Sequence, residues 1–155
     1  MSEKKILLVD HAPSPNTRKL RDAVLEGARD PEVEEVAIRH VPPLDATPED
    51  VLGCDAIILG TTENLAYMAG AMKDFFDRVY YPVLEETQGL PYGLYVRAGN
   101  DGAGTIRAIE TIVTGLRWRA VQDPLLCRGE FRDDFIGQAR ELGLYVAAAV
   151  SAGII

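Results

Sequence analysis

Three groups of polar and glycine residues hold the chemical groups that could bind a ligand. The first group follows the apolar run at residues 6–9 and contains His11, Ser14, Asn16 and Thr17. Hydroxyl, amide and free backbone N–H groups at the start of a helix favour an anion such as a phosphate. The same residue types also cap ordinary helices, so this segment alone leaves both interpretations open.

The second group follows the apolar run at residues 56–59 and contains Thr61, Thr62, Glu63 and Asn64. These side chains offer hydrogen-bond donors and acceptors to the edge of a flat ring or to a ribityl chain. A surface turn that caps the next helix is the competing interpretation.

The third group follows the apolar run at residues 93–96 and contains Gly99, Asn100, Gly102 and Gly104. Glycines permit positive φ angles and let the backbone approach a ligand closely. Their spacing, GxxGxG, differs from the dinucleotide fingerprint GxGxxG, and the group follows the fourth predicted strand rather than the first. The pattern therefore does not predict a Rossmann-type NAD site, and a flexible loop is the competing interpretation.

The elements that position these groups alternate between strand and helix. Apolar runs and turn residues predict strands at 4–10, 33–41, 56–60, 92–98 and within 120–127. Helical periodicity and capping residues predict helices from 16 or 17 to about 28, from 48 to 53, and at 69–81, 105–116 and 131–151. This alternation predicts an α/β fold, with three layers and a doubly wound, five-stranded parallel sheet in the order 2-1-3-4-5. The three groups would then meet at the carboxyl edge of the sheet, where such folds bind ligands.

Composition bounds the class of protein. A chain of 155 residues with 47% hydrophobic residues predicts one domain over residues 1–155 with a buried core. A net charge of −8 argues against nucleic acid as a partner. Cys54 and Cys127 form neither a CxxC pair nor a metal-binding spacing, which predicts no metal site and a reducing compartment. No apolar run is long enough for a signal peptide or a membrane span, so we expect a cytoplasmic protein.

The motifs resemble the flavodoxin-like superfamily and, within it, the group of NAD(P)H-dependent FMN and quinone reductases. Residues 14–20, SPNTRKL, look like the phosphate loop of that group, which often reads SGNTxxL. Residues 61–64, TTEN, resemble its TPEYN flavin-ring loop, and residues 67–78, YMAGAMKDFFDR, are similar to its NMxGxMKxFxDR helix. Residues 99–104 resemble its third, glycine-rich loop.

The resemblance implies FMN as the cofactor and NAD(P)H as the reductant. The 5′-phosphate of FMN would lie on Ser14, Asn16 and Thr17, with His11 as a further candidate donor. The flavin ring would lie against residues 61–64 and 99–104. The resemblance further implies electron transfer to a quinone, free flavin or a similar small-molecule acceptor, with no catalytic side chain required. It also implies a homodimer, for which residues 79–83 are the candidate surface.

Three positions depart from the family pattern and keep alternatives open. Pro15 replaces a glycine and removes an N–H group, and Thr62 and Asn64 replace the proline and the aromatic residue of TPEYN. Candidates for a replacement stacking ring are Tyr67, Tyr92 and Trp118. One alternative is a flavodoxin-type electron carrier that does not itself oxidise NAD(P)H. Another is a flavodoxin-like module that has lost FMN.

A receiver-like signalling domain of the same topology is disfavoured. Such a domain needs a pair of acidic residues after the first strand and an aspartate after the third. Asp10 stands alone after the first strand, and Gly60 and Thr61 follow the third.

Overall fold

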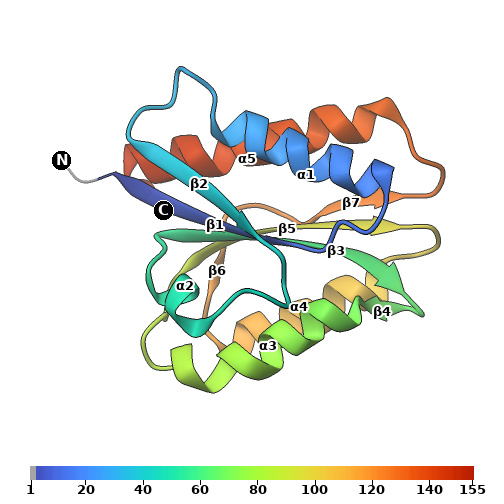
Figure 1. The fold of residues 1–155 in the computed structure, drawn as a ribbon, viewed down its shortest axis with the longest axis horizontal. Helices are drawn as coiled ribbons and strands as arrows, with labels where there is room; N and C mark the ends of the chain where they lie inside the picture. Colours follow the sequence, from blue (N-terminus) through green and yellow to red (C-terminus); the bar gives the residue numbers. More distant parts are fainter. Residues whose placement is uncertain (1–2) are drawn as a thin grey trace.

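A computed structural model describes residues 3–155, so the first two residues of the predicted domain lie outside the described part. The strands are β1 (Lys4–Asp10), β2 (Val36–Val41), β3 (Ala56–Asn64), β4 (Tyr67–Met68), β5 (Pro91–Ala98), β6 (Arg119–Ala120) and β7 (Leu125–Arg128). The helices are α1 (Pro15–Ala28), α2 (Pro48–Leu52), α3 (Gly70–Val83), α4 (Ala103–Gly115) and α5 (Asp133–Ala152). Figure 1 shows three layers, with α1 and α5 on one face of the sheet and α2, α3 and α4 on the other.

The sheet confirms the predicted doubly wound order. Its strands run β2-β1-β3-β5, with β6 and β7 both pairing with β5, and all of these pairings are parallel. The prediction of five strands is wrong in two details. The fifth position is divided between β6 and β7, and the short strand β4 pairs antiparallel with the end of β3.

Strand β3 is longer than predicted, which changes the second group of candidate residues. Thr61 and Thr62 continue the parallel ladder opposite Val96 and Arg97 instead of leaving the sheet as a loop. Their β-branched side chains favour this extended backbone. The chain then turns at Leu65 and Ala66 into β4.

Helix boundaries differ from the prediction by a few residues, for local reasons. Ser14, rather than Asn16 or Thr17, is the N-cap of α1, because Pro15 suits the first helical position. Thr47 is the N-cap of α2, which begins at Pro48 as predicted. Pro82 lies within the last turn of α3 rather than ending it, so α3 extends to Val83.

Close packing against α5 holds α1 in place on the sheet. A Cβ atom added to Gly143 of α5 would lie 2.1 Å from the backbone oxygen of Val24 on α1. A side chain at residue 143 would therefore force the helices apart, and glycine lets them approach. The N-terminus of α1 is thereby held at the carboxyl edge of the sheet, on the same side as the β3–β4 hairpin and the start of α4 (Figure 1).

None of the helices described is long and apolar enough to cross a membrane. No cluster of three or more His, Cys, Asp or Glu side chains that could hold a metal ion occurs within residues 3–155.

Candidate functional site

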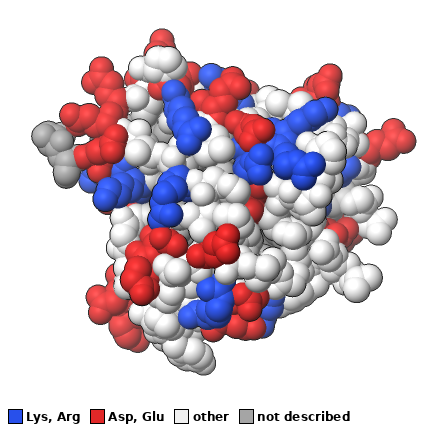
Figure 2. All heavy atoms as spheres, in the orientation of Figure 1, with Lys and Arg blue, Asp and Glu red and all other residues white. Residues whose placement is uncertain are grey.

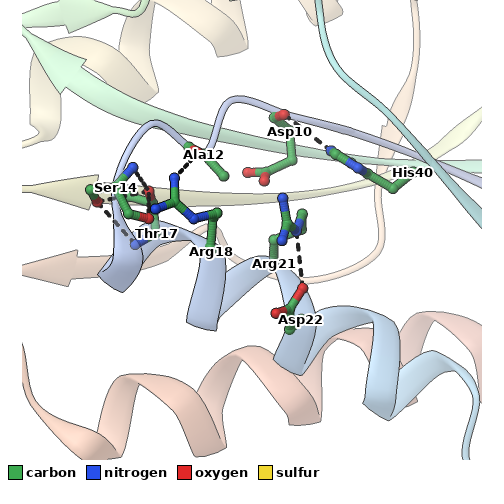
Figure 3. A network of polar contacts seen from close by, with 8 residues as sticks. All are labelled: Asp10, Ala12, Ser14, Thr17, Arg18, Arg21, Asp22 and His40. Carbon is green, nitrogen blue, oxygen red and sulfur yellow. Dashed lines mark hydrogen bonds and ion pairs between the residues drawn. The ribbon is translucent and has the colours of Figure 1, made fainter.

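The start of α1 is closed by a reciprocal cap. The Ser14 N–H donates to Thr17 Oγ1 at 2.9 Å, and the Thr17 N–H donates to Ser14 Oγ at 3.2 Å (Figure 3). This is a capping box, so the capping interpretation of the first group is confirmed. The hydroxyl groups predicted to hold a phosphate also cap the helix, and each hydroxyl oxygen can make further hydrogen bonds.

Other groups at this terminus could bind an anion. No acceptor for the Asn16 N–H is found within residues 3–155. Arg18 lies beside the loop, where its Nη1 donates to the backbone oxygen of Ala12 at 3.5 Å. Figure 2 shows Lys and Arg side chains grouped on the face where α1 lies, among scattered acidic residues. The electrostatic potential at this face is therefore more positive than the net charge of −8 for the whole chain suggests.

His11 joins the first group to β3. Its backbone N–H donates to the oxygen of Gly60 at 3.0 Å. Burial lowers the pKa of the His11 ring below its usual range, which makes the ring neutral at physiological pH. His11 can therefore offer a neutral ring nitrogen to a ligand, but no positive charge.

The second group forms a hairpin rather than a loop. Thr61 Oγ1 is buried and accepts a hydrogen bond from the Ala69 N–H at 3.1 Å, so this side chain faces α3 and serves the fold. Thr62 Oγ1 donates to Asn64 Oδ1 at 2.8 Å near the end of β3. The turn residues Leu65 and Ala66 have φ angles of 53° and 65°, a region that non-glycine residues rarely occupy.

Glu63 joins the second group to the third. Its carboxylate accepts hydrogen bonds from the Gly102 N–H at 2.6 Å and the Asn100 N–H at 3.3 Å. Gly102 has a φ angle of 75°, which suits glycine, and precedes the first turn of α4. A Cβ atom on Gly104 would lie 2.5 Å from the Ala66 oxygen, so α4 packs directly against the hairpin.

Open space remains beside the third group. A Cβ atom added to Gly99 would meet nothing within 4 Å. Of the candidate stacking rings, Tyr92 and Trp118 are buried in the core, and the Trp118 Nε1 donates to Thr87 Oγ1. Tyr67 is 40% exposed on β4, and it is the one ring of the three that lies at the carboxyl edge.

Sequence reasoning missed three residues at this edge: Asp10, Tyr95 and Arg97. Asp10 and Tyr95 are buried neighbours across Gly60. The Arg97 Nη1 donates to the oxygens of Ala98 and Cys127 at 2.8 and 3.0 Å. The available signal was the charged residue that directly follows an apolar run, Asp10 after residues 6–9 and Arg97 after residues 93–96, whereas nothing in the sequence marked Tyr95.

A separate cavity of about 400 Å³ lies away from these groups. It is lined by the first residues of β1, the middle of β2 and the end of α2, including Lys5, Arg39, Asp50 and Cys54. Arg39 and Asp50 are already paired at 2.6 Å. We therefore place the candidate site at the carboxyl edge.

Comparison with solved structures identifies the fold. An archaeal flavodoxin aligns with a TM-score of 0.79 at 19% identity, covering 96% of this chain and 99% of that one. The two-electron-reduced flavodoxin of Megasphaera elsdenii aligns at 0.75 and 17% identity, over 92% and 98% of the chains. A WrbA-like flavodoxin of Agrobacterium tumefaciens aligns at 0.72 and 17% identity, over 98% and 99%. The chain has the flavodoxin-like fold.

Sequence comparison supports the same superfamily. A flavodoxin of Aquifex aeolicus is 35% identical over 112 residues, which is 72% of this chain and 60% of that protein. An NAD(P)H dehydrogenase (quinone) of Archaeoglobus fulgidus is 32% identical over 96 residues, which is 47% of this chain and 50% of that protein. The chain thus spans half to three-fifths of these curated relatives. No protein-family model matches it.

The groups at the carboxyl edge of this flavodoxin-like chain suit a ligand with a phosphate and a flat body. The free Asn16 N–H, the nearby Arg18 and the start of α1 are an anion-binding donor set. Gly99, where an added Cβ atom meets nothing within 4 Å, and the partly exposed Tyr67 are both accessible to a ring. These residues therefore fit FMN, with fewer free hydroxyl groups than the sequence suggested.

Proposed function

We propose that this chain binds FMN and passes electrons from NAD(P)H through the flavin to a quinone, free flavin or a similar small acceptor. The observation that carries the proposal is the meeting of all three groups at one edge of the sheet. His11 joins the first group to β3 at Gly60, and Glu63 joins the end of β3 to the loop before α4. When bound, FMN supplies hydride acceptance and electron transfer.

The protein residues would bind and orient this cofactor. Asn16 and Arg18 would hold the phosphate, and Ser14 and Thr17 would fix the helix terminus that presents them. The ring would lie between the hairpin side chains Thr62 and Asn64 and the third group, Gly99, Asn100, Gly102 and Gly104. The Glu63 carboxylate connects the hairpin to the third group through its hydrogen bond with the Gly102 N–H.

Access to one ring face favours direct oxidation of NAD(P)H. Hydride transfer requires the nicotinamide to lie against the flavin, so one face must stay uncovered. Within the described residues, Tyr67 is the one partly exposed aromatic side chain of the candidate ring partners, and Gly99 has open space.

An electron carrier is the second candidate. The longer of the two curated matches described above is named a flavodoxin, and the net charge of −8 suits docking to a basic redox partner. Such a carrier would bind FMN at the same residues but would not be reduced by NAD(P)H on its own.

Anaerobic reduction separates these candidates. The purified chain is reconstituted with FMN, and its flavin absorption is followed after addition of NADH or NADPH, with dithionite as the control reductant. We expect the flavin bands to bleach with a nicotinamide cofactor. Bleaching with dithionite alone supports the carrier, and an FMN-free protein after reconstitution overturns the proposal.

We further propose a homodimer in a reducing, cytoplasmic setting. The candidate surface at residues 79–83 includes Tyr81, which is 80% exposed, and Tyr80, whose ring lies 5.1 Å from that of Tyr81. Tyr80 itself is half-buried against the core, so Tyr81 is the ring that this surface exposes, and exposed aromatic residues are enriched at protein interfaces. The free thiols of Cys54 and Cys127 agree with a reducing compartment.

A further inference from the structure

Three residues on neighbouring strands form a row beneath the first group. Asp10 on β1 is in register with Gly60 on β3, and Gly60 is in register with Tyr95 on β5. A Cβ atom on Gly60 would lie 2.4 Å from Asp10 Oδ1 and 2.5 Å from the Tyr95 hydroxyl oxygen. The side chains of Asp10 and Tyr95 therefore fill the space that glycine leaves open.

This row is buried and incompletely hydrogen-bonded. Asp10 is 3% exposed and Tyr95 is 2% exposed. Within residues 3–155, neither Asp10 Oδ2 nor the Tyr95 hydroxyl oxygen has a hydrogen-bond partner. An ionised carboxylate is costly in such surroundings. Burial accordingly raises the pKa of Asp10 from 3.8 to about 7, although the Tyr95 hydroxyl beside it and the charge of Arg21 act to lower this pKa.

The charges facing Asp10 from α1 largely cancel. Arg21 and Asp22 are its charged neighbours on this helix, and they pair with each other at 3.0 Å (Figure 3). On β2, His40 Nε2 lies 3.3 Å from the Asp10 backbone oxygen. Burial lowers the pKa of the His40 ring, which is therefore neutral above pH 7.

The remaining neighbours do not titrate near neutral pH. Burial raises the pKa of Tyr95 well above its ordinary value. Cys127 on β7 has a pKa raised to about 11, also by burial. Arg97 on β5 is the charged neighbour of Cys127, and its Nη1 donates to the Cys127 oxygen. Between pH 7 and pH 9, Asp10 is therefore the group in this neighbourhood whose charge changes.

Asp10 lies directly before the segment that would hold a phosphate. Figure 3 shows its carboxyl beside the first turns of α1, next to Arg21 and close to the loop that carries Ala12 and Ser14. Ser14 follows Asp10 by four positions, so their Cα atoms lie within about 14 Å of each other. Charges at such a separation interact appreciably when the path between them is partly buried.

We propose that Asp10 sets the discrimination between FMN and riboflavin: its neutral carboxyl admits the phosphate at the α1 N-terminus, and its carboxylate opposes it. This inference rests on the proposed binding of FMN. Because a phosphate dianion disfavours ionisation of a nearby carboxyl, FMN binding would take up protons at Asp10. The affinity for FMN therefore falls as the pH rises above 7, and the affinity for riboflavin, which has no phosphate, stays constant.

The test measures the dissociation constants of FMN and riboflavin by flavin fluorescence at pH 6, 7, 8 and 9. The wild-type protein is compared with Asp10→Asn, which keeps the shape of the side chain. The ionisation of the FMN phosphate near pH 6 is common to both proteins, so it cancels in their ratio. We expect the dissociation constant for FMN of the wild-type protein, divided by that of Asp10→Asn, to rise about tenfold from pH 6 to pH 9. A tenfold change corresponds to a shift of about one in pKa.

The outcomes are distinct. A ratio that stays constant while FMN binds overturns the role of Asp10 and leaves the proposed function intact. Absence of FMN binding by both proteins at every pH overturns the proposed function and this inference together. If Asp10→Asn does not fold, the wild-type protein alone decides, because FMN affinity must fall between pH 7 and pH 9 relative to riboflavin.

Discussion

At Asp10, a buried carboxyl makes stability depend on pH. The carboxyl ionises near pH 3.8 in the unfolded chain and near pH 7 in the folded chain, so the folded state binds more protons between these values. Stability therefore falls as the pH rises from about 4 to 7. Because a pKa unit corresponds to about 1.4 kcal/mol, the loss reaches at most about 4 kcal/mol.

Asp10→Asn should remove this loss. We expect the variant to be more stable than the wild-type protein at pH 8, by up to about 4 kcal/mol, and to lose this advantage at pH 4. Urea unfolding at both pH values measures the difference. A stability difference that is equal at pH 4 and pH 8 would show that Asp10 ionises normally in the folded protein.

Glu63 should affect both the free energy of unfolding and the midpoint potential of the bound flavin. In Glu63→Gln, one amide oxygen can still accept a hydrogen bond, but the amide NH₂ cannot accept from the Gly102 or Asn100 N–H. We expect a loss of about 1–2 kcal/mol in the free energy of unfolding. Because a negative charge near the ring disfavours the anionic reduced flavin, the variant should also have a higher midpoint potential.

The matched control is Glu85→Gln, at an exposed residue whose contact with Arg117 is 3.7 Å long. That change should alter neither the free energy of unfolding nor the midpoint potential measurably. An unchanged or lower potential in Glu63→Gln, measured against this control, would rule out an electrostatic role for Glu63.

Among the elements, the α1–α5 contact is the most sensitive to side-chain size. In Gly143→Ala, the new Cβ atom would lie 2.1 Å from the Val24 oxygen, so the helices must separate. We expect the free energy of unfolding to fall by about 1–3 kcal/mol. Gly137→Ala in the same helix is the control, since nothing lies within 4 Å of its added Cβ atom. It should raise stability by up to about 1 kcal/mol, and equal effects in the two variants would refute the packing argument.

The β3–β4 turn is strained by its residue types. Leu65 and Ala66 both have positive φ angles, for which Asn and Gly are the favoured residues in a two-residue hairpin. The double variant Leu65→Asn and Ala66→Gly should therefore raise the thermal midpoint, with a gain of about 1–2 kcal/mol. A lower midpoint in calorimetry would mean that the Leu65 side chain, exposed in this structure, has a stabilising contact elsewhere.

The sequence predicted most elements because strong local signals marked them. Thr47 and Pro48 predict the start of α2, and the apolar runs predict the central strands. The β3–β4 hairpin escaped prediction because Leu65 and Ala66 are not turn-forming residues. The row of Asp10 and Tyr95 escaped because residues 85 positions apart become neighbours only through the sheet register.

For the whole molecule, topology accounts for how much of the site could be foreseen. Parallel strands in the order β2-β1-β3-β5 bring three distant segments to one edge, and alternation of elements is visible in the sequence. The sequence does not show which group each polar side chain hydrogen-bonds to. Ser14 and Thr17 bind each other, and Thr61 binds the backbone of Ala69, because local caps and backbone groups compete with a ligand for the same hydroxyls.

At the same scale, the exposed Tyr81 predicts self-association. We expect the purified chain, of 16.9 kDa, to elute from gel filtration as a dimer, and Tyr81→Glu to elute as a monomer with an unchanged circular dichroism spectrum. A wild-type protein that elutes as a monomer at high micromolar concentration would exclude the proposed interface.

The central claim is that the carboxyl edge of this sheet binds FMN. The most direct test is an equilibrium titration of the purified, flavin-free chain with FMN at pH 6.5, followed by flavin fluorescence. We predict saturable binding of one FMN per chain, with weaker binding of riboflavin because the α1 N-terminus contributes through the phosphate. Absence of saturable binding, or equal affinity for FMN and riboflavin, would contradict the account.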